Sequence, residues 1–322
     1  MCKYIRPLLV FLICMCFKVN FANTDFINAC QKGARARIEF HIIDDEGSPV
    51  SNATVNAFFD MMDRSKGKRI IGNTNTNGVF IAEATTGGEI EIEVSKQQYY
   101  PSKATVCLIN MGNEHKVLMG KWQPWGMMKM IRLLPVKKPI ATITSTPTWK
   151  YTNVTNKWVG FDLVKHDFVS PYGQGKVSDV EVFYDWNGVW DEKCDGLKIQ
   201  IRFPTKFSGG YYMAKIPESE YVGVYTAHSN AIYQTEFSFF ERAIRNRRGR
   251  IERWERNLFD DSKVLVVRSR CILNDDGTLK SAHYFQLSHI QFACGENGVA
   301  LKLLTIYNPT PNDTNLEPAN MP

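Results

Sequence analysis

Short stretches of alternating apolar and polar residues recur along most of the chain. The clearest is residues 89–94, where Ile90, Ile92 and Val94 alternate with three glutamates. Successive side chains of a β-strand point to opposite faces of a sheet, so this pattern predicts a strand with one face in a core and the other in solvent. Further strands are predicted at residues 37–42, 180–184, 197–203 and 299–307.

Turn-forming residues separate the predicted strands. Glycine, proline, asparagine and aspartate are concentrated at residues 44–49 and 74–78. The segment Asn274-Asp275-Asp276-Gly277 lies between apolar stretches at 263–273 and 279–292, which predicts a β-hairpin. Short strands with such turns every ~8–12 residues are typical of a β-sandwich, so the sequence predicts a mostly β protein.

One segment departs from the period of two. Its large apolar residues recur at steps of three, four and seven, and they are Phe237, Phe240, Ile244, Ile251, Trp254 and Leu258. This spacing lines one face of an α-helix. The pattern therefore predicts one Arg-rich helix, which Gly249 could divide into two shorter helices.

A series of turn motifs follows the first predicted strand. It begins with Asp45-x-Gly47-x-Pro49-Val50, continues with Thr74-x-x-x-Gly78-x-Phe80, and ends at Tyr99-Tyr100 after the strand at 89–94. In this order the motifs make residues 36–135 resemble the carboxypeptidase regulatory-like domain, also called the transthyretin-like domain. The resemblance implies a Greek-key β-sandwich that serves as an accessory or structural module and contributes no catalytic residues.

The rest of the chain predicts a second domain. Proline and threonine residues at 136–150 indicate an extended linker. Residues 151–308 predict an antiparallel β-rich domain that contains the Arg-rich helix, and residues 309–322 predict an extended tail rich in proline and asparagine. Two motifs in this half are Pro171-Tyr172-Gly173-x-Gly175-Lys176 and Asn308-Pro309-Thr310-Pro311-Asn312-Asp313. Through them the half resembles the C-terminal halves of exported bacterial proteins of unassigned role, and this resemblance implies no particular activity.

The amino terminus predicts export. Residues 1–22 combine Lys3 and Arg6, an apolar run from Pro7 to Phe17, and the small residue Ala22, as a signal peptide does. The apolar run is too short for a helix that crosses a ~30 Å hydrocarbon layer. We therefore expect no transmembrane helix in the mature chain, and a periplasmic, outer-envelope or extracellular location. Residues 23–35 predict a polar lead-in after the signal peptide.

Charge and cysteine content narrow the possible partners. The net charge is +6, and removal of Lys3, Arg6 and Lys18 with the signal peptide leaves +6 − 3 = +3, which argues against a nucleic-acid partner. The mature chain keeps an odd number of cysteines, so at least one would lie outside any intrachain disulfide or would pair between chains. These cysteines are Cys30, Cys107, Cys194, Cys271 and Cys294, and their spacing matches no zinc site.

Two segments are candidate binding sites. The first is the Arg-rich stretch, where guanidinium groups suit phosphate or carboxylate ligands. Its candidate anion-binding residues are Arg245, Arg248, Arg250 and Arg253. The alternative is a solvated surface in which the arginines pair with neighbouring glutamates.

The second candidate is a loop that combines tryptophans with acidic residues. Its members are Asp185, Trp186, Trp190 and Asp191. Carboxylate oxygens on a glycine-bent loop could hold calcium, and exposed tryptophan rings could stack on sugars. The alternative is an ordinary acidic loop whose tryptophan packs inward.

The sequence contains no recognised catalytic, metal-binding or cofactor-binding motif, so no catalytic residue, metal or cofactor is expected. The leading hypothesis is an exported, non-catalytic envelope or extracellular protein that binds a protein or a cell-surface glycan. One alternative is a secreted hydrolase of unfamiliar type with carboxylates in the C-terminal domain. Another is a structural subunit that assembles through sheet edges.

Overall fold

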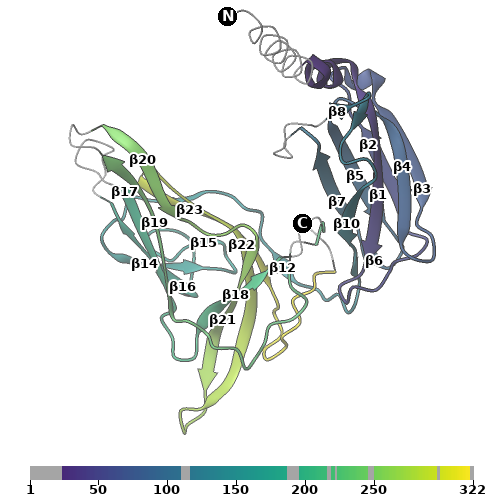
Figure 1. The fold of residues 1–322 in the computed structure, drawn as a ribbon. Coiled ribbons are helices and arrows are strands. Elements are labelled where there is room, and N and C mark those ends of the chain that lie inside the picture. Colours follow the sequence, from purple (N-terminus) through teal and green to yellow (C-terminus); the bar gives the residue numbers. More distant parts are fainter. Residues whose placement is uncertain are drawn as a thin grey trace, which may run out of the picture. The chain divides into compact units, whose positions relative to one another are not determined.

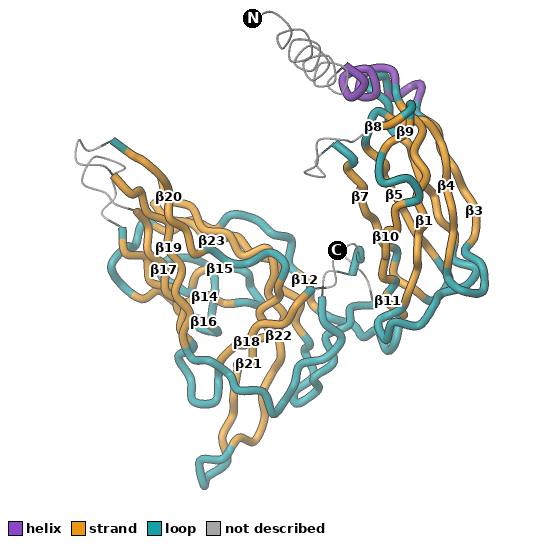
Figure 2. Tube along the Cα trace, in the orientation of Figure 1, coloured by secondary structure: helices purple, strands orange, loops and turns teal. Residues whose placement is uncertain are grey.

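The structure is a computed structural model that describes residues 24–109, 117–186, 196–215, 219–221, 223–245, 250–295 and 298–319. The prediction of a mostly β protein with antiparallel sheets is confirmed (Figures 1 and 2). The described chain forms two compact units, which are Met1–Val136 with Ile216–Tyr221, and Lys137–Lys215 with Val222–Pro322. Residues 24–32 form a helix and Arg64–Lys66 a 3-10 turn.

Two sheets make the first unit. The first sheet contains β1 (Ala34–Ile43), β4 (Val79–Thr86), β8 (Val117–Leu118), β9 (Lys121–Trp122) and β10 (Met127–Arg132). The second sheet has the order β3 (Lys68–Asn73), β2 (Thr54–Phe59), β5 (Glu89–Ser95) and β7 (Ser102–Cys107). A small pair joins β6 (Tyr99–Tyr100) to β11 (Leu134–Pro135).

The core of the first unit lies between its two sheets. In β5, Ile90, Ile92 and Val94 are buried while the glutamates lie on the other face, which confirms the prediction from alternation. Phe40 of β1 and Val55 of β2 belong to the same cluster of buried residues. β1 pairs antiparallel with β4 on one side and parallel with β10 on the other, so it is an interior strand of its sheet.

Two larger sheets make the second unit. One contains β12 (Ile143–Thr144), β13 (Lys150–Thr152), β18 (Gly209–Ala214), β21 (Lys263–Leu273), β22 (Leu279–Gly295) and β23 (Gly298–Tyr307). The other contains β14 (Trp158–Asp162), β15 (Asp167–Phe168), β16 (Val180–Asp185), β17 (Gly196–Arg202), β19 (Glu236–Arg245) and β20 (Ile251–Asn257). The predicted hairpin around residues 274–277 is confirmed, because β21 pairs antiparallel with β22.

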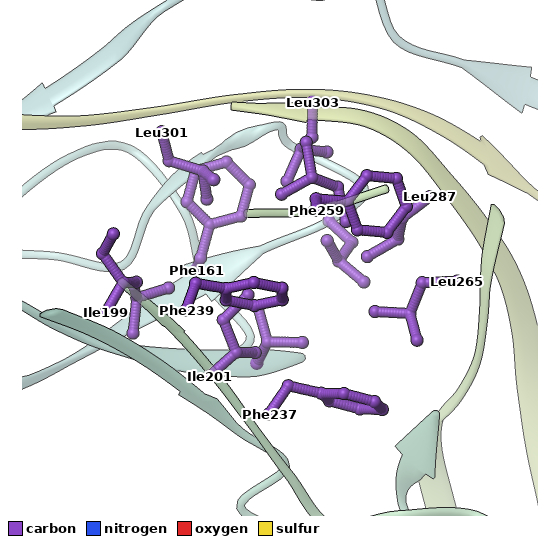
Figure 3. Close-up of a cluster of buried hydrophobic side chains, with 14 of the residues drawn as sticks. Phe161, Ile199, Ile201, Phe237, Phe239, Phe259, Leu265, Leu287, Leu301 and Leu303 are labelled. Carbon is purple, nitrogen blue, oxygen red and sulfur yellow. The ribbon is translucent and has the colours of Figure 1, made fainter. Parts of the chain in front are cut away.

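Side chains from both sheets meet in the core of the second unit. Phe161 and Phe239 come from the sheet of β14 and β19, and Leu287 and Leu303 come from the sheet of β22 and β23 (Figure 3). All four are at most 3% exposed. The two sheets of this unit therefore form a second β-sandwich with its own core.

β21 is buried on both faces. Leu265 and Val267 face the main core, while Val264 and Val266 belong to a smaller cluster that also contains Leu316. This arrangement explains the uninterrupted apolar run Val264–Val267, because a strand covered on both faces needs no polar alternate positions. The chain near Leu316 is part of this cover, so the described residues of the C-terminal segment pack on the second unit.

The predicted Arg-rich helix is wrong. Most of its described residues form β19 and β20, which pair antiparallel with each other. Phe237 and Phe239 are buried and Ser238 is exposed, so the segment also has the period of a strand. The segment forms a strand and not a helix because β19 pairs with β17, and this pairing buries both phenylalanines in the core.

Two neighbouring phenylalanines test this strand assignment. A helical stripe would bury Phe240, whereas the strand buries Phe239 and leaves Phe240 on the outer face beside Arg242. We expect Phe239→Ala to lower the free energy of unfolding by about 3–5 kcal/mol, and Phe240→Ala by about 1 kcal/mol or less. Urea denaturation of both variants measures the difference, and the opposite order of effects would contradict the strand.

Candidate functional site

The Arg-rich segment is a charged hairpin. Arg242 Nε donates to Glu255 Oε2 at 2.6 Å, and Arg256 Nε donates to Glu241 Oε1 at 2.6 Å. Among the four candidate anion-binding residues, Arg250 is exposed just before β20. Arg245 and Arg253 lie on β19 and β20 with only their backbones described, and Arg248 lies outside the described residues. The described pairs balance positive charge with negative charge across the two strands.

The tryptophan-rich loop is described only at its beginning. Asp185 ends β16 and is exposed. Trp186 is 5% exposed and packs in the core of the second unit, so its ring is not available to stack on a sugar. Trp190 and Asp191 lie outside the described residues.

The second unit contains an ionic cluster with two buried carboxylates, and its residues belong to none of the motifs found in the sequence. We call it the Arg270 cluster, and it consists of Arg270, Asp162 and Asp179. Arg270 Nη2 lies 2.9 Å from Asp162 Oδ1 and 2.9 Å from Asp179 Oδ2, and Arg270 Nε donates to Asp179 Oδ1 at 3.0 Å. The side chain of Asp162 is 2% exposed and that of Asp179 is 0% exposed, so both carboxylates depend on this arginine for charge compensation.

A bulge in β21 aims Arg270 at the cluster. The pairing of β21 with β22 shifts after Ser269, and Arg270 has a φ of +52°. Consecutive residues of a regular strand point to opposite faces, yet Ser269 Oγ and Arg270 Nε both bond to Asp179 Oδ1 at 3.0 Å. The bulge therefore directs two neighbouring side chains to one carboxylate.

Backbone amides occupy the remaining hydrogen-bond acceptor sites of the Asp162 carboxylate. Oδ1 accepts from the amides of Val164 and Lys165 at 3.0 Å, and Oδ2 accepts from those of Lys176 and Val177 at 2.9 and 3.1 Å. This single carboxylate thus holds both ends of the segment between β14 and β16. Its role is to position a loop.

Close packing in this loop explains part of its glycine-containing motif. A Cβ atom on Gly173 would lie 2.4 Å from the carbonyl oxygen of Phe168, and one on Gly175 would lie 2.7 Å from that of Asp167. Both distances are far below van der Waals contact, so a larger residue at either position would displace the backbone. The two glycines allow the loop to fold back on β15.

The environment of Asp162 keeps it ionised. Burial alone would raise its pKa, but the amides of Lys165, Lys176 and Val177 and the charge of Arg270 outweigh burial and lower the pKa below its ordinary value. Burial alone would lower the pKa of Arg270. The hydrogen bond to Asp179 and the negative charges of Asp179 and Asp162 outweigh burial, so the pKa of Arg270 is raised. Because their acceptor sites are occupied, these two carboxylates do not form the acid–base pair that the hydrolase alternative requires.

The outer face of the first sheet exposes apolar side chains. Ile81 of β4 and Met128 of β10 flank Glu39, and Val79 and Met130 flank His41 in the next row. Ile81, Met128 and Met130 are 45%, 57% and 52% exposed. We call these six residues the methionine face. Clustered exposed apolar residues are typical of interaction sites, and methionine adapts well to partners of different shape.

Within the described chain, no group of three histidine, cysteine or acidic residues is placed to hold a metal ion. None of the helices described there is both long and apolar enough to cross a membrane. The structure describes four cysteines, and it joins no two of them by a disulfide; they are Cys30, Cys107, Cys271 and Cys294. Cys194 lies outside the described residues.

Comparison with known proteins gives distant likenesses only. No family model matches the chain. No curated protein matches either.

Solved structures with partial similarity include two dioxygenases and a pilin. 3-Chlorocatechol 1,2-dioxygenase from Rhodococcus opacus 1CP is 10% identical over 33% of this chain and 62% of its own, with a TM-score of 0.27. Catechol 1,2-dioxygenase from Acinetobacter radioresistens is 13% identical over 32% of this chain and 53% of its own, with a TM-score of 0.25. The shaft pilin SpaA from Lactobacillus rhamnosus GG is 10% identical over 57% of this chain and 95% of its own, with a TM-score of 0.24. The chain thus spans less than two thirds of either dioxygenase, and no activity, ligand or partner follows from similarities of this size.

The Arg270 cluster predicts a large effect of losing its cation. Arg270→Met leaves two buried carboxylates without compensation, so we expect the free energy of unfolding to fall by about 3–5 kcal/mol. Arg202→Met is the matched control, because Arg202 pairs with Glu181 on the surface and should cost about 1 kcal/mol. Urea denaturation compares the two variants, and equal effects would show that the cluster is not the stronger interaction.

The lowered pKa of Asp162 predicts a pH dependence of stability. A carboxyl whose folded-state pKa lies below its unfolded value stabilises the fold fully above the unfolded value of ~3.9, and this contribution disappears as the pH falls through the folded value. Asp162→Asn should therefore lower stability at neutral pH and flatten the decline in acid. Urea denaturation between about pH 6 and about pH 2.5 measures both profiles. Parallel profiles for variant and wild type would contradict the lowered pKa.

Proposed function

We propose that this protein is exported and acts by binding a partner without catalysing a reaction. The predicted signal peptide at 1–22, which lies outside the described residues, supports export. The methionine face supports partner binding, and it is the observation that carries the proposal. The accessory role implied by the resemblance of residues 36–135 to the carboxypeptidase regulatory-like domain agrees with it.

The composition of the methionine face favours a protein partner over a glycan. Its exposed members Ile81, Met128 and Met130 are aliphatic, and they present no flat aromatic ring for a sugar to stack on. Glu39 and His41 lie between them, with Glu39 Oε2 4.0 Å from His41 Nε2. An apolar surface divided by polar groups matches the usual make-up of a protein–protein interface.

The sheet beneath the face supports this function physically. β1, β4 and β10 are held in register by backbone pairing, and their inward residues Phe40, Ala82 and Ile131 are buried in the core. The exposed side chains are therefore presented on a rigid platform, so little backbone entropy is lost when a partner binds.

Site-specific photo-crosslinking tests the proposal. A benzophenone amino acid at Met128 of the full-length protein, produced in its own cells, should give one discrete crosslinked product of higher mass. The same group at Met62 is the matched control, because Met62 is 80% exposed in the first unit but outside the methionine face. Met130→Glu should remove the product by placing a charge in the interface.

The outcomes separate the alternatives. Equal products from Met128 and Met62, or none from Met128, would count against the methionine face. Retention of the purified protein on cell-wall polysaccharide that is unaffected by Met130→Glu would favour a glycan partner bound elsewhere.

A further inference from the structure

β20 is the last strand of its sheet. The order is β15-β14-β16-β17-β19-β20, and no other described strand pairs with the second edge of β20. An edge strand presents backbone N–H and C=O groups that can pair with a strand of another molecule. The side chains along such an edge then decide whether pairing is allowed, and in which register.

The residues of β20 are complementary to themselves when the strand is reversed. Residues 252–256 read Glu-Arg-Trp-Glu-Arg. If two copies pair antiparallel about a two-fold axis at position 254, residue 252 lies opposite residue 256 and residue 253 lies opposite residue 255. A glutamate then faces an arginine at every charged position.

The same alternation already exists inside the chain. Arg256 bonds to Glu241, and Glu255 bonds to Arg242 across the β19–β20 pair. In the two-fold arrangement, Glu252 of the second copy would lie on the other side of Arg256. Each row across the joined sheets then alternates in charge, which favours pairing because directly opposite charges attract and like charges repel.

Neighbouring registers are unfavourable. A two-fold axis at position 253 places that arginine opposite its own copy, and also sets Arg250 opposite Arg256. An axis at position 255 places Glu255 opposite itself. Among these three registers, only the one centred on position 254 sets no like charges opposite each other.

We propose that two copies of this chain join through β20, in antiparallel register about position 254, to form a two-fold dimer with a continuous sheet. The interface is self-complementary, as a two-fold axis requires, so the pairing ends with two copies instead of extending into a fibre. This inference goes beyond partner binding by the methionine face and does not depend on it.

Two charge variants of the full chain test the pairing. Glu252→Lys places a lysine opposite Arg256 of the other copy, and Arg256→Glu places a glutamate opposite Glu252 of the other copy. Because the two-fold axis repeats each clash, either variant alone should weaken association by at least about tenfold. Sedimentation equilibrium of the purified protein at low salt measures the association constant.

Mixing the two variants is the decisive measurement. In a mixed pair, the lysine introduced in one copy faces the glutamate introduced in the other, and the remaining Arg256 faces the remaining Glu252. An equimolar mixture of E252K and R256E should therefore restore the dimer to near the wild-type association constant. This rescue also excludes misfolding as the reason for the loss, since unfolded chains would not recover on mixing.

A matched control and two outcomes complete the test. Asp275→Lys makes the same change of charge in the exposed turn between β21 and β22, and the dimer should persist. A monomeric wild-type protein at high micromolar concentration would overturn the proposal. Variants that remain dimeric, or a mixture that stays monomeric, would overturn it as well.

Discussion

The second unit depends on a buried ion pair that joins its two sheets. Arg270 comes from β21 in one sheet, while Asp162 ends β14 in the other and Asp179 immediately precedes β16. Removing charges from water is costly, so such a pair is stable only when its remaining hydrogen-bonding groups are satisfied. Here four backbone amides bond to Asp162, and the loop between β14 and β16 takes its shape from those bonds.

Local patterns predicted much of the fold. The alternation at 89–94 is sufficient to predict strand β5, because each buried residue has a polar neighbour. The turn at 274–277 is sufficient to predict the β21–β22 hairpin, because a tight turn between two apolar stretches fixes their pairing. The helix at 237–258 was wrong because the segment carries two periods at once. Phe237 fits both, and only pairing with β17 decides that Phe239 is buried and Phe240 is not.

The functional surfaces were harder to predict, because they join residues far apart in the sequence. Arg270 is 108 positions from Asp162, and neither residue belongs to a motif. Met128 lies beside Glu39 only because β10 pairs parallel with β1, a connection that alternation cannot reveal. Of the two candidate sites taken from sequence, the Arg-rich segment is a hairpin in which Arg242 and Arg256 pair with glutamates, and anion binding by its other arginines stays a prediction. In the tryptophan-rich loop, Trp186 is a core residue.

Opposite charges serve different purposes in the two parts of the second unit. In the Arg270 cluster the two carboxylates are buried, so losing the arginine leaves negative charge that water cannot reach. Along β20 the charges are exposed, and each pair adds little free energy because water and salt screen it. Exposed charges can still determine register, since a shift of the two-fold axis by one position to either side of 254 brings like charges together. A charged edge therefore prevents indiscriminate sheet growth and, where its sequence is self-complementary, leaves one pairing open.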